Sequence, residues 1–313
     1  MSDARPYSGV RILDLTRELG SYSTRLFADL GAEVVRVEPP EGAADRRRPP
    51  PLPGLNSEAL GGAPFAYLAA NKASVTLDLA AEEGMRTFEA LAKSAQILAI
   101  EPGPDQPDVV AEAIAANPAL VVAIFSWFGM GGPASGHAGS DLVAQAAGGL
   151  AWLSGTPEEA PLRVAGEQTH MVASLYGAVA MGIALWDAEL RGHGHVIDVS
   201  AQEAIAHSLQ NAVQVWDLEK RISRRGGEGT RDCSEDMFRC KDGWVFLAAP
   251  PTLGISWRQL VAWITEEGHF SAARLSEKQW LDRPWRNTAP AKAEFRALCE
   301  VFIADRTQQW LTD

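Results

Sequence analysis

The segment GEQTHMVASLYG, residues 166–177, holds the side chains best suited to chemistry within an otherwise apolar stretch. Residues three and four apart are neighbours on a helix surface, so helical spacing would place Glu167, His170 and Ser174 on one face. A neutral imidazole at position 170 could act as a general base near pH 7. The residues alone leave two interpretations of His170 open, a catalytic group and a structural one.

The pair His193 and His195, in the segment RGHGH, is a candidate for metal binding. A zinc site takes three or four protein ligands, and no carboxylate or third ligand stands beside these histidines in the sequence. We therefore favour a turn that leads into a strand. Neither a metal site nor a tightly bound cofactor is predicted.

The chain lacks the motifs of two functions that are common among α/β proteins, catalysis by a serine nucleophile and NAD binding. The chain has no G-x-S-x-G, so a serine nucleophile on a strand-to-helix turn is not predicted. A strand, a helix and a second strand lead to Glu38, where an acid could meet a ribose, but the turn offers only Gly20 in place of G-x-G-x-x-G. The sequence thus predicts a Rossmann-like scaffold without an NAD site.

The composition is that of a globular protein with one large and one smaller domain, since 46% of the 313 residues are hydrophobic and 22% charged. A formal net charge of -12 disfavours nucleic acid and anionic membranes as partners, so an anionic ligand would need local arginines or helix N-termini. Three scattered cysteines fit a reducing compartment. With no signal-peptide pattern and no apolar run of membrane-span length, we expect a cytoplasmic protein without a membrane partner.

Strand-like and helix-like patterns alternate through the first two thirds of the chain. This order predicts parallel βαβ units and a doubly wound sheet. The expected strands lie within 10–15, 33–38, 74–79, 96–101, 119–126 and 194–200, and the expected helices within 22–32, 81–94, 108–116, 141–155, 167–190 and 201–221. The helix over 167–190 is too apolar for a fully exposed surface, so we expect it in a core or a subunit interface.

A smaller α+β domain is expected at the C-terminal end. Residues 236–250 show a hairpin pattern with Lys-Asp-Gly as its turn, and helical patterns follow over 256–268 and 292–306. The predicted bounds are 1–218 for the large domain, 219–236 for a linker with a Gly-rich loop, and 237–313 for the small domain. The long loops 38–64 and 128–140 are candidates for functional segments.

Six segments, in order and over nearly the whole chain, resemble the class III CoA-transferase family, which includes the α-methylacyl-CoA racemases. They span residues 9–42, 71–79, 117–155, 161–186, 191–204 and 237–249. The resemblance implies a Rossmann-like large domain, a small domain and two subunits interlocked as rings. It also implies coenzyme A thioesters and carboxylic acids as substrates.

The resemblance assigns parts of the CoA site. Asn71 and Lys72 fall where the family holds the adenosine end, and Gly226, Gly227 and Gly229 fall in a loop that closes over the thioester in some members. Where relatives carry an arginine for the CoA phosphates this chain reads IEPGPD, so Arg46 and Arg48, beside Arg47, are candidate replacements. The family also continues beyond TQQWL with a segment that returns to the large domain, and we expect this chain to lack it.

The family's catalytic Asp lies six residues before an aromatic such as Tyr176, and that position here is His170. The family's Asp attacks the acyl-CoA and then stores CoA as a thioester on its own carbonyl. An imidazole has no such carbonyl. Glu167, one helical turn away, and Asp141, whose alternative role is to cap the following helix, are the candidate substitutes.

Three functions stay open. The chain is a CoA-transferase-family protein that moves CoA between an acyl-CoA and a carboxylic acid, as a homodimer or as a degenerate subunit of a heteromer. Alternatively, it is an acyl-CoA racemase or epimerase that uses His170 as a base, although the histidine of the racemases is replaced in Gly139-Ser140-Asp141. The third alternative is a noncatalytic CoA-binding or interaction subunit.

Overall fold

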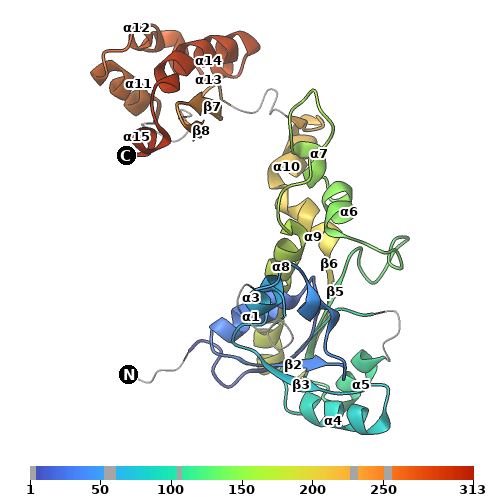
Figure 1. Cartoon of the computed structure of the whole chain (residues 1–313). Coiled ribbons are helices and arrows are strands. Elements are labelled where there is room, and N and C mark those ends of the chain that lie inside the picture. Colours follow the sequence, from blue (N-terminus) through green and yellow to red (C-terminus); the bar gives the residue numbers. More distant parts are fainter. Residues whose placement is uncertain (1–4, 53–60, 104–107, 226–231, 250–255) are drawn as a thin grey trace. The chain divides into compact units, whose positions relative to one another are not determined.

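The computed structural model describes residues 5–52, 61–103, 108–225, 232–249 and 256–313 (Figure 1). The chain divides into two compact units, Met1–Ile222 and Ser223–Asp313. The domain bounds expected from the sequence, 1–218 and 237–313, remain predictions. The glycine-rich loop with Gly226, Gly227 and Gly229 lies outside the described residues.

The first unit is built on a six-stranded sheet with the order β3-β2-β1-β4-β5-β6. Every neighbouring pair is parallel, which confirms the predicted α/β fold. The central strands β1, β4 and β5 are buried on both faces, as expected for parallel strands covered by helices. The strands are β1 Arg11–Leu15, β2 Glu33–Glu38, β3 Ala73–Thr76, β4 Ile97–Ile100, β5 Val121–Ser126 and β6 Val196–Ser200.

Helices cover both faces of this sheet (Figure 1). On one face α1 and α8 pack around Phe125, and an added Cβ on either Gly20 or Gly177 would lie under 3 Å from its ring. On the other face α4 and α5 enclose a core around Phe88. The helical elements of this unit are α1 Ser21–Asp29, η1 Ala44–Arg47, α3 Ala63–Leu68, α4 Glu82–Ala92, α5 Val109–Ala116, α6 Asp141–Ala147, α7 Leu150–Leu153, α8 Gln168–Arg191, α9 Ala201–Ser208 and α10 Gln210–Glu219.

Two predicted helices are each divided in the structure. The helix expected over 141–155 breaks into α6 and α7 at Gly149, whose φ of 92° is left-handed and ends a helix without strain. The helix expected over 201–221 breaks into α9 and α10 at Leu209. Hydrophobic periodicity continues across both breaks, so the sequence pattern alone predicted single helices.

Helix α8 is, within the described residues, the one helix long and apolar enough by length and composition to cross a membrane. It packs against β5, β6, α1 and α9 instead. One side of it faces the sheet, while Leu175, Val179, Ile183, Trp186 and Leu190 are exposed on the other. The side of α8 that faces the sheet is therefore part of the core, as expected. No described residue of this chain covers its exposed apolar side.

The second unit, described by itself, pairs a hairpin with a helical cluster. Strands β7 Asp236–Cys240 and β8 Gly243–Leu247 are antiparallel, as the hairpin pattern predicted. Trp257, Trp280 and Phe295 form the centre of its core, and Arg286 lies over the Trp257 ring at 3.6 Å. The helices are α11 Ser256–Glu266, α12 Ser271–Leu275, η4 Lys278–Leu281, α13 Arg283–Arg286, α14 Ala289–Ala304 and α15 Gln308–Thr312.

Candidate functional site

The N-terminus of α8 is held in place by two buried polar side chains. Asp141 Oδ1 accepts a hydrogen bond from the Thr169 N–H at 3.0 Å, and so satisfies a free donor in the first turn of α8. One turn further on, Ser174 Oγ donates to the Leu19 carbonyl at 2.5 Å. These contacts fix the start of α8 against the turn between β1 and α1.

Asp141 itself is enclosed by partners. Its Oδ2 accepts from Gln145 Nε2 and Arg163 Nε, each at 2.9 Å, and only 7% of the residue is exposed. Burial raises the pKa of Asp141, but the hydrogen bonds from Thr169, Arg163 and Gln145 outweigh it, so the net shift is downward. These contacts make Asp141 a helix-positioning carboxylate, and its catalytic role stays a prediction.

His170 is 5% exposed, and its ring lies beside Trp127 with the centroids 5.6 Å apart. Its Nδ1 is 3.3 Å from Glu167 Oε2 and its Nε2 is 3.7 Å from Glu18 Oε2. Neither nitrogen has a hydrogen-bond partner within the described residues. Burial lowers the pKa of His170 more than the Glu18 carboxylate raises it, which favours a neutral imidazole enclosed between two acids.

Glu167 is the most accessible of the three predicted catalytic side chains, since His170 and Asp141 are both buried. It is the N-cap residue of α8, and 35% of its side chain is exposed. Its carboxylate forms an ion pair with Arg48, whose side chain is 18% exposed. Helix N-termini favour negative charge, so both the Arg48 guanidinium and the positive end of α8 lie where they favour the charge of this carboxylate.

Glu18 is a member of this cluster that the sequence analysis missed. It lies in the turn after β1, with 42% of its side chain exposed. Glu101 holds that turn in place: one of its carboxylate oxygens accepts hydrogen bonds from the backbone N–H groups of Arg17, Glu18 and Leu19, at 2.7–3.1 Å. No local motif marks Glu18, because it meets His170 only through the packing of α8 on this turn.

The arginine run 46–48 serves different partners. Arg46 binds the Glu38 carboxylate through two hydrogen bonds of 2.5 and 2.6 Å, and Arg48 pairs with Glu167. Arg47 is exposed and makes no ion pair or hydrogen bond among the described residues. Burial raises the pKa of Glu38, but bonds from Arg46, Ser74 and the Ala43 N–H lower it to about 2.

The predicted adenosine-end residues have structural contacts. Lys72 Nζ, in a side chain only 1% exposed, lies 2.8 Å from Asp14 Oδ2 and 2.8 Å from the Ser21 carbonyl. Asn71 adopts a left-handed φ of 63° and its side-chain amide donates to Asp29 Oδ1 at 2.7 Å. Their binding of CoA stays a prediction, and with these contacts Lys72 is tied into the interior.

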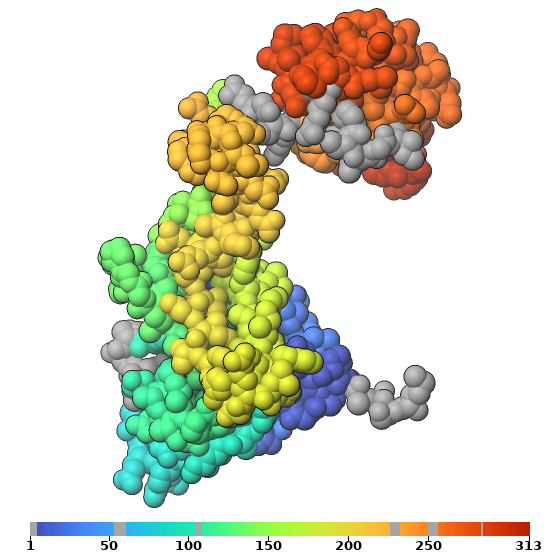
Figure 2. All heavy atoms as spheres, turned by 180° about the vertical axis from the view of Figure 1, so that it is seen from behind, coloured from blue at the N-terminus to red at the C-terminus, as the bar shows by residue number. Residues whose placement is uncertain are grey.

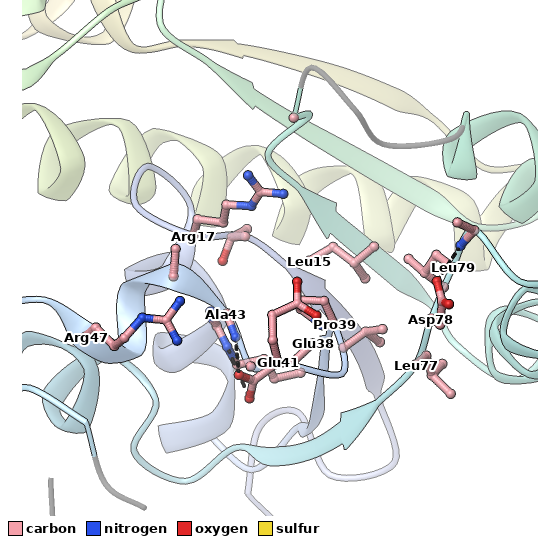
Figure 3. A pocket seen from close by; sticks show the side chains of 17 residues that line it. Leu15, Arg17, Glu38, Pro39, Glu41, Ala43, Arg47, Leu77, Asp78 and Leu79 are labelled. Carbon is pink, nitrogen blue, oxygen red and sulfur yellow. Dashed lines mark hydrogen bonds and ion pairs between the residues drawn. The ribbon is translucent and has the colours of Figure 1, made fainter. Parts of the chain in front are cut away.

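A cavity of about 440 Å³ opens where β1, β2 and β3 end. Figure 3 shows Arg17 and Arg47 on one side of it, Leu77, Asp78 and Leu79 on the other, and Glu38 between them. Open parallel sheets bind ligands at the carboxyl ends of their strands, so this is the expected position for a small-molecule site. Arg17 and Arg47 bring guanidinium groups to this cavity, whose lining also includes the acids Glu38, Glu41 and Asp78.

The strand order, the cavity at the carboxyl ends and the carboxylates at the start of α8 define an α/β protein of the Rossmann type with a charged site at its sheet edge. The sequence model of CoA-transferase family III matches residues 7–312. The chain belongs to this family, and the resemblance seen in the sequence is confirmed.

Curated relatives carry related activities. The chain is 34% identical to the succinyl-CoA:(R)-benzylsuccinate CoA-transferase subunit BbsE of Thauera aromatica, over 96% of this chain and 74% of that protein. It is also 34% identical to the succinyl-CoA–L-malate CoA-transferase alpha subunit of Chloroflexus aurantiacus, over 78% of this chain and 58% of that subunit. The chain thus spans about three quarters of the first relative and less than two thirds of the second.

Solved structures agree with the fold. A CAIB/BAIF family protein from Brucella suis superposes with a TM-score of 0.80 at 24% identity, covering 99% of this chain and 81% of that one. Rv3272 from Mycobacterium tuberculosis gives a TM-score of 0.78 at 25% identity, with the same coverage. Both likenesses extend over the α/β sheet unit and the small unit.

Proposed function

We propose that this chain is a CoA-transferase subunit that moves CoA from an acyl-CoA to a carboxylic acid, and that Glu167 is the carboxylate that carries CoA between them. The observation that supports this most is the difference between the two neighbours on α8. His170 is buried, whereas Glu167 offers a carboxylate, 35% exposed, at the start of the helix. Only a carboxyl group can store CoA as a thioester.

Each step of the transfer balances on Glu167. Its carboxylate attacks the thioester carbonyl of the donor, which forms a mixed anhydride and releases CoA as a thiolate. The thiolate attacks the Glu167 carbonyl, so the glutamyl-CoA thioester forms and the donor acid leaves. The acceptor carboxylate then attacks this thioester, and the thiolate released attacks the acceptor carbonyl of the new anhydride, which returns Glu167 as a carboxylate.

Neighbouring groups support the charges that develop. Arg48 and the N-terminus of α8 lie beside Glu167, where they would stabilise the negative charge of each tetrahedral intermediate. Glu18 and Glu167 lie on two sides of the His170 ring, so a neutral imidazole would keep these acids apart. In this arrangement His170 positions Glu167, and the group that reacts is the carboxylate.

We place the nucleotide end of CoA in the cavity at the ends of β1, β2 and β3, where Arg47 is a cation without a described partner. Arg47→Ala should weaken CoA binding about tenfold to a hundredfold, since a hydrogen bond to a charged group contributes about 1.5–3 kcal/mol. Isothermal titration with free CoA measures this. Arg86→Ala, which removes an exposed arginine from α4 outside the cavity, should bind as the wild type does. Equal affinity in both variants would exclude this placement.

The relatives favour a heteromer as the working form. Two of them are described as the alpha and beta subunits of a succinyl-CoA–L-malate CoA-transferase, and a third as subunit BbsE. On this chain, the exposed side of α8 and residues Tyr7, Leu26 and Leu30 line an open groove of about 600 Å³. Figure 2 shows α8, in yellow-green, at the surface beside the blue N-terminal segments.

We infer that this groove receives a related subunit, because an apolar stripe this long is costly to leave in water. Trp186 lines this groove and is 69% exposed. Trp186→Ala should weaken association by about 2 kcal/mol or more, as buried aromatic anchors do. Sedimentation of the purified chain with a co-expressed homologue measures it. Trp244→Ala removes an exposed ring of the small unit and serves as the control; loss of association only in that variant would contradict the inference.

The transfer itself is tested with succinyl-CoA as donor and a panel of dicarboxylic acids as acceptors, with new acyl-CoA measured by chromatography. The chain is assayed alone and with the related subunit. Transfer that appears in either sample and requires Glu167 supports the proposal. If the pair transfers CoA equally well when Glu167 of this chain is replaced, the related subunit supplies the reacting carboxylate.

A further inference from the structure

The end of α8 brings a carboxylate to the two histidines of the segment RGHGH. Asp187 Oδ2 lies 2.7 Å from His195 Nε2, and the His193 and His195 rings lie 5.4 Å apart between centroids. One ligand atom from each of the three residues lies within 4.8 Å of the others. The structure therefore differs from the sequence expectation that no third ligand stands beside these histidines.

The backbone around this cluster is fixed by contacts that any rearrangement would break. Gly192 ends α8 in a left-handed conformation with φ of 75°. Gly194 has no room for a side chain, because an added Cβ would lie 1.9 Å from the Leu120 carbonyl oxygen. The Val122 N–H donates to the His195 carbonyl at 2.7 Å. His193 and His195 thus leave the turn two residues apart, with their rings in contact.

The carboxylate is also oriented. Arg191 Nε lies 2.7 Å from Asp187 Oδ1, so the arginine holds one oxygen while the other faces His195. Fixed orientation of a ligating carboxylate by an outer partner is a recurrent feature of metal sites. The side chains of Asp187 and His195 are 30% and 35% exposed and His193 is exposed, so an ion could enter from solvent and keep water ligands.

We propose that Asp187, His193 and His195 bind a divalent transition-metal ion, for which Zn²⁺ is the matching probe. Two imidazole nitrogens and one carboxylate oxygen are ligands that zinc accepts, with the fourth position left to water. Ligand atoms on one zinc ion lie at most about 4.2 Å apart, so a small rotation of the exposed His193 ring closes the site. A bound ion would join the end of α8 to the residues that lead into β6. The site is independent of Glu167 and of CoA.

The test is zinc titration of the full chain, free of any affinity tag and stripped with chelator. We expect one Zn²⁺ per chain, with affinity at least about tenfold lower in His193→Ala and in His195→Ala, because even outer partners of metal ligands contribute that much. His137→Ala removes an exposed imidazole outside the cluster and should bind as the wild type does.

A second readout separates binding from folding. Zn²⁺ should raise the thermal midpoint of the wild type and of His137→Ala, and leave that of His193→Ala unchanged. Without metal, all three should melt alike, since the mutated rings are largely exposed. Stoichiometric binding that survives in both cluster variants would overturn the assignment, and so would a wild type that takes up no zinc.

Discussion

Glu167→Gln is expected to reduce CoA transfer roughly a thousandfold or more, the scale on which enzymes lose rate when a covalent nucleophile is removed. The amide keeps the size and much of the polarity of the side chain, but it cannot attack a thioester or carry CoA as a glutamyl thioester. Because the Glu167 side chain is 35% exposed, the fold should tolerate the change. The initial rate of acyl-CoA formation from succinyl-CoA measures the effect.

Two further variants serve as controls for this result. Glu189→Gln alters an exposed glutamate on the same helix and should transfer CoA at the wild-type rate. His170→Ala opens a space beside Glu167 and should slow transfer while still allowing CoA to be carried, since the reacting group remains. A His170→Ala variant that transfers CoA at the wild-type rate would contradict the positioning role of His170.

Lys72→Met is expected to lower the free energy of unfolding of the sheet unit by about 3–5 kcal/mol, because it leaves one member of a buried ion pair without its partner. Asp14 is fully buried and accepts from Lys72 Nζ at 2.8 Å, and Arg36 Nη1 lies 3.8 Å from the same oxygen. Burial raises the pKa of Asp14, but Lys72 and Arg36 outweigh it and hold that pKa below its usual value. Urea unfolding followed by circular dichroism measures the loss.

The matched control is Lys93→Met, at the end of α4, where an exposed lysine has no charge partner among the described residues and stability should change little. In the double variant Asp14→Asn/Lys72→Met both charges are absent, so much of the loss should be recovered. A Lys72→Met protein of unchanged stability but weakened CoA binding would favour the adenosine-end role that the family resemblance implies.

The sheet could be predicted from the sequence because each strand carries its own signal. Residues 33–38 are rich in valine and 119–126 are an apolar run, and these became β2 and β5 with little change. Helix ends were less predictable. Gly149, with its left-handed φ, and Leu209 interrupt helices whose apolar spacing continues unbroken, so the spacing alone did not predict these ends.

The candidate site was predictable in part. Glu167 and His170 share a helix face by spacing alone, and that proximity is confirmed at 3.3 Å. Their different exposure was not predictable, since it depends on Trp127 and on the turn that carries Glu18. Asp187 could not be joined to His193 and His195 from the sequence either, because the helix end and the turn at Gly192 bring them together.

The central claim, that Glu167 carries CoA, is tested most directly by the intact mass of the protein after incubation with succinyl-CoA. We predict a gain of one CoA less one water on the wild type and on Glu189→Gln, and no gain on Glu167→Gln. Borohydride should reduce the thioester, so that Glu167 ends as an alcohol with one oxygen fewer and two hydrogens more, which peptide mapping locates. A wild type without the adduct, alone and with its related subunit, would contradict the claim, and so would an adduct that persists in Glu167→Gln.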